Sequence, residues 1–357
     1  MRHLCPHRAA LRAGRLRSTA VLPRGEGRAD SRGGHHRGWQ HVELCRRRHG
    51  LFQPRRADDP DLHLLFDVRL PADRRFDLGC CDMRARGFML GGTAGRTTLA
   101  GEGLQHQDGH SHLFAMAYPT VRAYDPAFVY EVVTIMLDGM DRMYAKGEDW
   151  IYYITVYNEN YEMPSMPAGC EEGILKGIYR LRDVTAKKPA AALPPVQLLG
   201  SGAILREVLR AADLLAESWG ISSTVWSVTS WKELRRDAQE CRRWNMLHPE
   251  AEPRSSYLET TLAASEGVFV AASDHVRAVP EQLDSWIPGG LFVLGTDGFG
   301  RSETRGPLRR HFEVDAECIV IGTLYQLAQR GAIGGDEVAR AIATLGVDPE
   351  KVDAALA

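Results

Sequence analysis

Residues 196–228, VQLLGSGAILREVLRAADLLAESWGISSTVWSV, decide the fold. The apolar run 196–199 predicts a strand, which ends at the glycines of residues 200–202. The residues up to Gly220 predict a helix, because one face collects its apolar side chains: Ile204, Leu205, Val208, Ala211, Ala212 and Leu215. Residues 224–228 predict the next strand. A strand, a crossover helix and a strand at this spacing indicate a parallel pair.

The same alternation continues on both sides of this stretch. Further strands are predicted at 150–157, 268–272 and 291–294, and further helices at 125–144, 170–181, 231–244, 318–330 and 337–345. Asp125 and Pro126 are the predicted N-cap and first turn of the helix at 125–144. The Pro/Ala-rich segment 187–195 is the best internal boundary. We therefore expect an α/β protein whose C-terminal part is a doubly wound, mostly parallel sheet.

Composition narrows the class of protein. A chain of 357 residues with 44% hydrophobic content can bury a sizeable core and is long enough for two or more domains. The net charge of -2 gives no overall electrostatic reason to expect nucleic acid or an anionic membrane as a partner. No apolar run reaches the length of a membrane span. The seven cysteines show no paired framework, which favours a reducing, cytoplasmic setting.

Residues 101–112, GEGLQHQDGHSH, hold three histidines around Asp108. Such a segment is typical of a metal site, of a proton-transfer site, or of a solvated polar loop. His110 and His112 form only an H-x-H pair, and Cys81 and Cys170 do not complete a zinc pattern, so no metal ligand is assigned. The residues alone favour the other two interpretations and leave a metal site as the weaker alternative.

Two glycine-rich loops, at 200–202 and 295–300, follow predicted strands. Ligands of parallel sheets bind at the carboxyl ends of strands, where these loops lie. Neither loop carries the full dinucleotide fingerprint, so a plain tight turn is the favoured reading of both.

Four strings resemble the decarboxylating first component of pyruvate dehydrogenase complexes, of the homodimeric bacterial type. They are GGTAGRTTLAGEGLQHQDGHSH (91–112), YNENYEMPSMP (157–167), SVTSWKELRRDAQECRRWNMLHP (227–249) and LGTDGFGRSETR (294–305). The resemblance runs from about Arg84 to Ala357, three quarters of the chain. Transketolases and the 2-oxoglutarate counterpart share the fold of this family but not these strings.

The resemblance implies a transketolase-like fold that binds thiamine diphosphate and Mg²⁺. In this family the cofactor attacks the keto carbon of pyruvate, carbon dioxide leaves, and the two-carbon unit passes to the lipoyl domain of the acetyltransferase component. The resemblance thus implies an oxidoreductase that forms a homodimer.

The resemblance also assigns candidate site residues. His106, His110 and His112 are candidates for positioning pyruvate and moving protons, and Gln105 and Gln107 for contacting the cofactor. In the family a glutamate stands at the position of Gln107, and an amide can form hydrogen bonds there but cannot act as a base.

The resemblance divides the chain into a partial pyrimidine-binding middle domain (82–186), a linker (187–195) and a transketolase-like C-terminal domain (196–357). In such enzymes the last domain mainly supports the dimer. The resemblance therefore implies that the loops 200–202 and 295–300 hold the domain and its interface rather than a phosphate.

Residues 1–80 have a different composition. They are rich in arginine, and the first lysine of the chain is Lys146. A transit peptide or a nucleic-acid-binding arm would account for some of the arginines, but aspartates such as Asp58 and Asp59 interrupt the basic run. Reverse translation of residues 66–78 and a shift of one base give SMFGFQRIGD, and residues 22–39 similarly give a phrase ending in ITEAG; both resemble the family. We expect residues 1–80 to be an out-of-frame translation.

This reading predicts that the chain is inactive by itself. The family's glutamate that activates the cofactor lies in ITEAG, where this chain reads residues 36–39 as HRGW, and the sequence given holds no equivalent of the domain with the diphosphate and magnesium ligands. The main alternative is a non-catalytic dimerisation or docking module, the remnant of a broken gene. A further alternative is a metal protein that uses the histidines of the chain: His35, His36, His106, His110 and His112.

Overall fold

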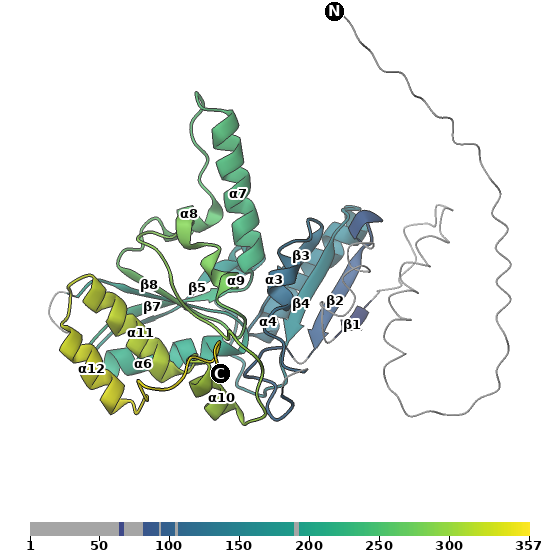
Figure 1. The fold of residues 1–357 in the computed structure, drawn as a ribbon. Helices are drawn as coiled ribbons and strands as arrows, with labels where there is room; N and C mark the ends of the chain where they lie inside the picture. The colour runs from purple at the N-terminus through teal and green to yellow at the C-terminus, as the bar shows by residue number, and fades with distance from the viewer. Residues whose placement is uncertain (1–63, 68–80, 93, 104–105, 189–192) are drawn as a thin grey trace, which may run out of the picture. The chain divides into compact units, whose positions relative to one another are not determined.

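The structure is a computed structural model that describes residues 64–67, 81–92, 94–103, 106–188 and 193–357 (Figure 1). The chain divides into two units, residues 1–36 and 37–357, and all described residues belong to the second. The segment predicted to be out of frame lies outside the described residues, apart from the strand β1 (Leu64–Asp67).

The first sheet is entirely parallel, with the strand order β1-β2-β4-β3. It contains β2 (Gly87–Gly92), β3 (Val121–Tyr124) and β4 (Ile151–Val156), the last of which confirms the strand predicted at 150–157. Five of the six residues of β4 are buried, because both faces of the sheet are covered.

The helix predicted at 125–144 begins four residues later than expected. It consists of α4 (Val129–Met140) and a π-helical turn, η2 (Asp141–Ala145). The carboxylate of Glu131 accepts two backbone hydrogen bonds from the residues just before α4 and so caps the helix from its first turn. The prediction of Asp125 as N-cap is wrong, because its side chain lies in the buried site described below.

The prediction of a helix at 170–181 is wrong for its second half. Helix α5 (Glu171–Lys176) ends at Gly177, whose φ of 113° is readily adopted only by glycine. The chain then forms the strand β5 (Ile178–Val184), which pairs antiparallel with the second sheet. Residues 178–184 thus belong to the second sheet, ahead of the linker predicted at 187–195.

The second sheet has the order β5-β7-β6-β8-β9, and all its pairs except β5–β7 are parallel. Its remaining strands are β6 (Val196–Gly200), β7 (Ser223–Val228), β8 (Val268–Ala272) and β9 (Phe292–Leu294). All four agree with the sequence prediction to within a residue, and the predicted doubly wound α/β class is confirmed.

Helices cover both faces of the second sheet (Figure 1). Alternate residues of β6 show this, because Leu198 packs with α6 (Leu205–Ser218) and α11 (Ala316–Gln329), whereas Leu199 packs with α7 (Trp231–Leu247). The remaining short and peripheral helices are α3 (Ser111–Ala115), η3 (Gly202–Ile204), α8 (Tyr257–Leu262), α9 (Ala278–Glu281), η4 (Asp284–Trp286), α10 (Arg305–His311) and α12 (Gly335–Thr344).

The carboxyl ends of the two sheets meet. Hydrogen bonds and an ion pair join residues just past the ends of β3 and β4 to residues just past the ends of β6 and β8. The segment 94–112, which follows β2, lies between them and bonds to both. We call this region the seam, and it holds most of the predicted site residues.

Candidate functional site

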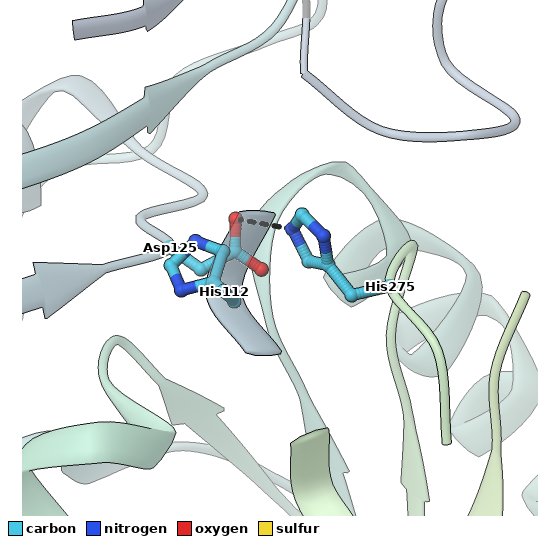
Figure 2. A group of neighbouring side chains, drawn as sticks. All are labelled: His112, Asp125 and His275. Atoms are coloured by element: carbon cyan, nitrogen blue, oxygen red, sulfur yellow. Dashed lines mark ion pairs between the residues drawn. The ribbon is translucent and has the colours of Figure 1, made fainter. Parts of the chain in front are cut away.

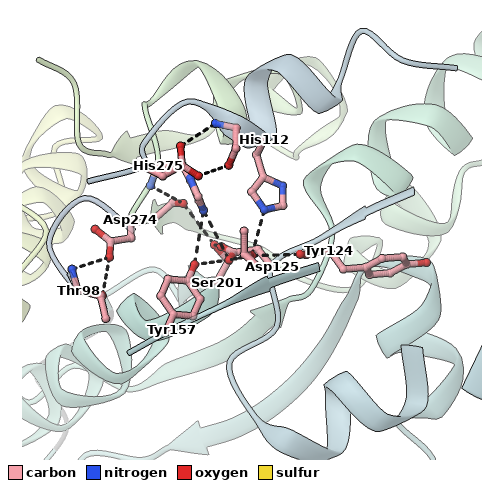
Figure 3. Close-up of polar contacts among 12 residues, drawn as sticks. Thr98, His112, Tyr124, Asp125, Tyr157, Ser201, Asp274 and His275 are labelled. Atoms are coloured by element: carbon pink, nitrogen blue, oxygen red, sulfur yellow. Dashed lines mark hydrogen bonds and ion pairs between the residues drawn. The ribbon is translucent and has the colours of Figure 1, made fainter. Parts of the chain in front are cut away.

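A buried carboxylate, Asp125, is the centre of the seam (Figure 3). It follows β3 and accepts hydrogen bonds from Thr155 Oγ1 at 2.7 Å, from Ser201 Oγ at 2.6 Å and from the Tyr157 hydroxyl. Thr155 and Tyr157 come from β4 and its end, whereas Ser201 follows β6. One side chain of the first sheet is therefore tied to the second sheet through short, charge-assisted hydrogen bonds.

Two histidines lie beside this carboxylate (Figure 2). His275 follows β8, and its Nε2 lies 3.6 Å from Asp125 Oδ1, with both side chains fully buried. His112 comes from α3 and contacts Thr155 Oγ1 at 3.2 Å through its Nε2. The two imidazole rings meet edge to face with their centroids 4.6 Å apart.

The environment shifts the pKa values of the two histidines in opposite directions. Burial and the neighbouring His275 lower the pKa of His112 to about 4, so His112 is neutral at pH 7. Burial also opposes a charge on His275, but the Asp125 carboxylate outweighs it and raises the pKa of His275. The pKa of Asp125 is lowered in turn, because the histidines and hydroxyl donors stabilise its charge more than burial disfavours it.

These three residues have the donor types of a metal site. Their ligand atoms all lie within 4.8 Å of one another, and all three side chains are buried. However, hydroxyl groups already donate to both carboxylate oxygens of Asp125, and His275 Nε2 lies 3.6 Å from Oδ1. We therefore describe the group as a buried ion pair with a neutral neighbour, not as a metal site.

A second buried carboxylate, Asp274, holds the start of the segment 94–112. It accepts hydrogen bonds from the backbone N–H and the hydroxyl of both Thr97 and Thr98, at 2.6 to 3.2 Å. Burial raises the pKa of Asp274 despite these four donors. The segment is thus anchored to the residue next to His275.

His110 lies on the other side of the segment, against Arg96. The Arg96 guanidinium contacts His110 Nδ1 at 2.9 Å and donates to the carbonyl of Thr296 at 2.9 Å. Partial burial and the Arg96 charge lower the pKa of His110, so it too is neutral at pH 7. Asp108 accepts hydrogen bonds from the backbone N–H groups of His110 and Ser111, both at 3.0 Å, and fixes the turn before α3.

His106 is the accessible histidine of the three. Its side chain is 46% exposed, and its Nε2 lies 4.0 Å from a carboxylate oxygen of Glu102. The next residue, Gln107, is buried and bonds to protein backbone on both sides, as described below. Gln105 lies outside the described residues.

The predicted histidines therefore occupy three environments. His112 belongs to the buried ion-pair network, His110 packs on Arg96, and His106 faces solvent. Sequence reasoning missed Asp274 and His275, and it used Asp125 as a helix cap. A signal for the first two was present, because both directly follow the predicted strand 268–272, where a parallel sheet places its polar site residues.

The glycine loops predicted at 200–202 and 295–300 contact the seam. A side chain at Gly202 would collide with the ring of Tyr157, and one at Gly300 would come within 2.6 Å of Gln107 Oε1. These glycines allow close approach between protein segments.

The comparisons agree with this architecture. Residues 177–315 match the family described as the transketolase-like C-terminal domain. The transketolase of Campylobacter jejuni superposes with a TM-score of 0.53 and 17% identity over 73% of this chain and 35% of its own, and that of Leishmania mexicana with 0.52 and 16% over 72% and 33%. The chain therefore has the transketolase-like α/β fold.

More specific matches define the family. Residues 66–164 match the pyruvate dehydrogenase E1 component middle domain. The pyruvate dehydrogenase E1 component of Cupriavidus necator is 53% identical over 270 residues, and that of Escherichia coli K12 is 52% identical over 278. The chain belongs to the pyruvate dehydrogenase E1 component family, a family of thiamine-diphosphate enzymes, as the resemblance predicted.

The matches cover most of this chain but less than a third of each relative. They span 76% and 77% of this chain but only 30% and 31% of the two relatives. The middle-domain match begins at residue 66, inside the segment predicted to be out of frame.

The described residues do not fit the diphosphate end of the cofactor. Mg²⁺ bound to a diphosphate requires oxygen ligands and keeps several of its waters. Among the described residues, one group has the composition and spacing of a cation site, and that group is fully buried in hydrogen bonds between the two sheets.

Proposed function

We propose that this chain supplies the middle and C-terminal domains of an enzyme that oxidatively decarboxylates pyruvate with thiamine diphosphate and Mg²⁺ and transfers the acetyl group to a lipoyl domain. The observation that supports it most is the 53% identity to a pyruvate dehydrogenase E1 component, over a segment that includes the histidines of the seam. The cofactor would supply the carbanion chemistry when bound.

The three histidines have different roles in this proposal. His106 is exposed and lies beside a carboxylate, so it is the residue that exchanges protons with the substrate or the lipoyl group. His110 is neutral and half-buried, so it orients the substrate as a hydrogen-bonding partner. His112 is fully buried in the ion-pair network and acts only by holding the seam together.

A chimera tests the catalytic proposal. Residues 82–357 replace the matching segment of the Cupriavidus necator relative, and the purified chimera is assayed for pyruvate-dependent acetylation of a lipoyl domain. We expect an active chimera whose kcat falls by roughly 10²- to 10⁴-fold in His106→Ala, the usual loss for a general acid–base group. A folded chimera without activity, or an unaffected His106→Ala variant, would contradict the proposal.

We also propose that the 357-residue polypeptide is inactive by itself. Calorimetric titration with thiamine diphosphate and Mg²⁺ is expected to show no heat of specific binding. Pyruvate added to the polypeptide is expected to remain unconsumed. An active chimera together with an inactive polypeptide supports the enzyme reading, whereas an inactive chimera favours the alternative, a non-catalytic dimerisation or docking module.

We propose a second copy of the chain as the partner of helix α4. Apolar side chains at helical spacing form an exposed stripe along α4 and η2: Val129, Val133, Leu137, Met140 and Tyr144. Such stripes on soluble proteins mark interaction sites, and the family resemblance implies a homodimer. Leu137→Glu is expected to shift the protein to monomers in sedimentation velocity, while Val352→Glu, at an equally exposed apolar residue elsewhere, leaves the dimer intact.

A further inference from the structure

The side chain of Gln107 bonds to the backbone of Leu99 and to that of Arg301, which lies 194 residues further along the sequence. Its amide nitrogen donates to the carbonyls of Leu99 at 2.9 Å and Arg301 at 2.8 Å, and its amide oxygen accepts from the Arg301 N–H at 2.7 Å. The Gln107 amide and the Arg301 backbone thus exchange two hydrogen bonds, as paired residues of neighbouring strands do. Two carbonyls and one N–H require an amide, because a carboxylate cannot donate to the carbonyls.

The surrounding contacts are built around this amide. Gly300 lies so close that an added Cβ would come within 2.6 Å of Gln107 Oε1. The Gly101 N–H donates to the carbonyl of Glu303 at 2.9 Å, and an added Cβ at Gly103 would collide with Ser302. The turn that ends at His106 and Gln107 therefore lies against residues 300–303 through its described residues.

This turn carries His106. The backbone N–H groups of His106 and Gln107 both donate to the carbonyl of Gly103, at 3.1 and 3.2 Å. His106 is half-exposed and has a single ion-pair neighbour, Glu102, at 4.0 Å, which is too far to fix its ring. The position of the ring thus depends on the backbone beneath it, and Gln107 is the buried residue that holds this backbone.

We propose that Gln107 is a positioning residue for His106: its amide fastens the backbone of His106 and Gln107 to residues 300–301 of the C-terminal domain. The catalytic meaning of this position rests on the proposed function, whereas the fastening itself does not. Gln107 is thereby assigned a role within the protein, in place of the cofactor contact expected from the resemblance.

Hydrogen exchange of the full chain tests the proposal. Gln107→Leu removes all three hydrogen bonds at similar volume, and we expect the protection of the His106 and Gln107 amides to fall at least tenfold, as for a locally opening segment. Gln197 gives a matched control, because it is equally buried and bonds to Trp226 and Glu266 far from the turn. Gln197→Leu is expected to leave the protection of the turn unchanged.

Gln107→Glu adds a signature that a general loss of stability would not produce. At neutral pH the carboxylate keeps its acceptor for the Arg301 N–H but leaves both carbonyls without a donor. On acidification the protonated carboxyl donates to one carbonyl, so the protection factor of His106 is expected to recover. Unchanged protection in Gln107→Leu, or equal losses in Gln197→Leu, would overturn the proposal.

The imidazole signal of His106 gives the second readout. In the full chain we expect one narrow NMR resonance that broadens or splits in Gln107→Leu and also in Gly300→Ala, which displaces the amide from the opposite side. A His106 signal unaffected by both variants would overturn the positioning role. Neither measurement uses turnover, so failure here and failure of the proposed function are distinguishable.

Discussion

At the scale of single residues, burial decides what each histidine of the seam does. His112 and His275 are both fully buried, yet only at His275 does the neighbouring Asp125 carboxylate outweigh burial and raise the pKa. Breaking such a buried pair from one side usually costs about 3–5 kcal/mol, because the remaining charge has no partner. The seam is therefore a stabilising feature that depends on pH.

The combined contribution of His112 and His275 to the free energy of unfolding is expected to be greatest near pH 6.5. The folded pKa of His112, about 4, lies below its ordinary 6.5, so the unfolded chain binds the extra proton between these values and stability falls as pH falls. A shift of this size corresponds to roughly 3 kcal/mol. The folded pKa of His275 is raised, so its stabilisation is present below pH 6.5 and is lost as pH rises through the folded pKa.

Urea unfolding on either side of pH 6.5 measures both effects. His112→Gln is expected to flatten the loss of stability on the acid side, and His275→Gln the loss on the alkaline side. Identical pH profiles for wild type and both variants would contradict the assigned protonation states.

At the scale of elements, Gly177 decides where α5 ends and β5 begins. Its φ is 113°, and an added Cβ would lie 2.5 Å from the carbonyl oxygen of Ser230. Gly177→Ala is expected to cost about 2–4 kcal/mol, from backbone strain together with the collision. Gly169→Ala is the matched control, since Gly169 also has a positive φ but has open space around it, and only about 1–2 kcal/mol is expected there. Equal losses of unfolding free energy in the two variants would refute the role of the collision.

The sequence predicted elements well where the apolar period was long and unambiguous. Strand β8 was predicted to the residue, and α6 and α11 to within about two, because each buries one continuous face. The segment 170–181 failed because its apolar residues fit a helix and a strand equally well, and the outcome depends on Gly177 and on pairing with β7.

The site was predictable only in part for a related reason. The His-rich string was found by composition and by resemblance, but Asp125, Asp274 and His275 become neighbours only when two sheets meet. Local sequence carries no signal for such a contact. The roles of His106 and Gln107 remain predictions that the experiments above test, and the role of His110 remains a prediction.

At the scale of the whole molecule, the described residues form one parallel and one mostly parallel sheet, joined at the carboxyl ends of their parallel strands. None of the described helices is long and apolar enough to cross a membrane. The out-of-frame reading of residues 1–80 makes a prediction about the gene. DNA sequencing upstream of the codon for Gly91 is expected to show codons that encode SMFGFQRIGD and ITEAG in the neighbouring frame. Codons incompatible with these strings would refute it.

The seam also limits how this architecture can be recombined. Replacing one of the two sheets by that of a distant relative would remove the Ser201 hydroxyl that donates to Asp125. It would also separate Asp274 from the hydroxyl groups of Thr97 and Thr98. We expect crossover points to be tolerated only outside the stretch from Gly95 to Arg305, because contacts within it join the two sheets. The two sheets therefore constitute one unit of exchange, although each has its own hydrophobic core.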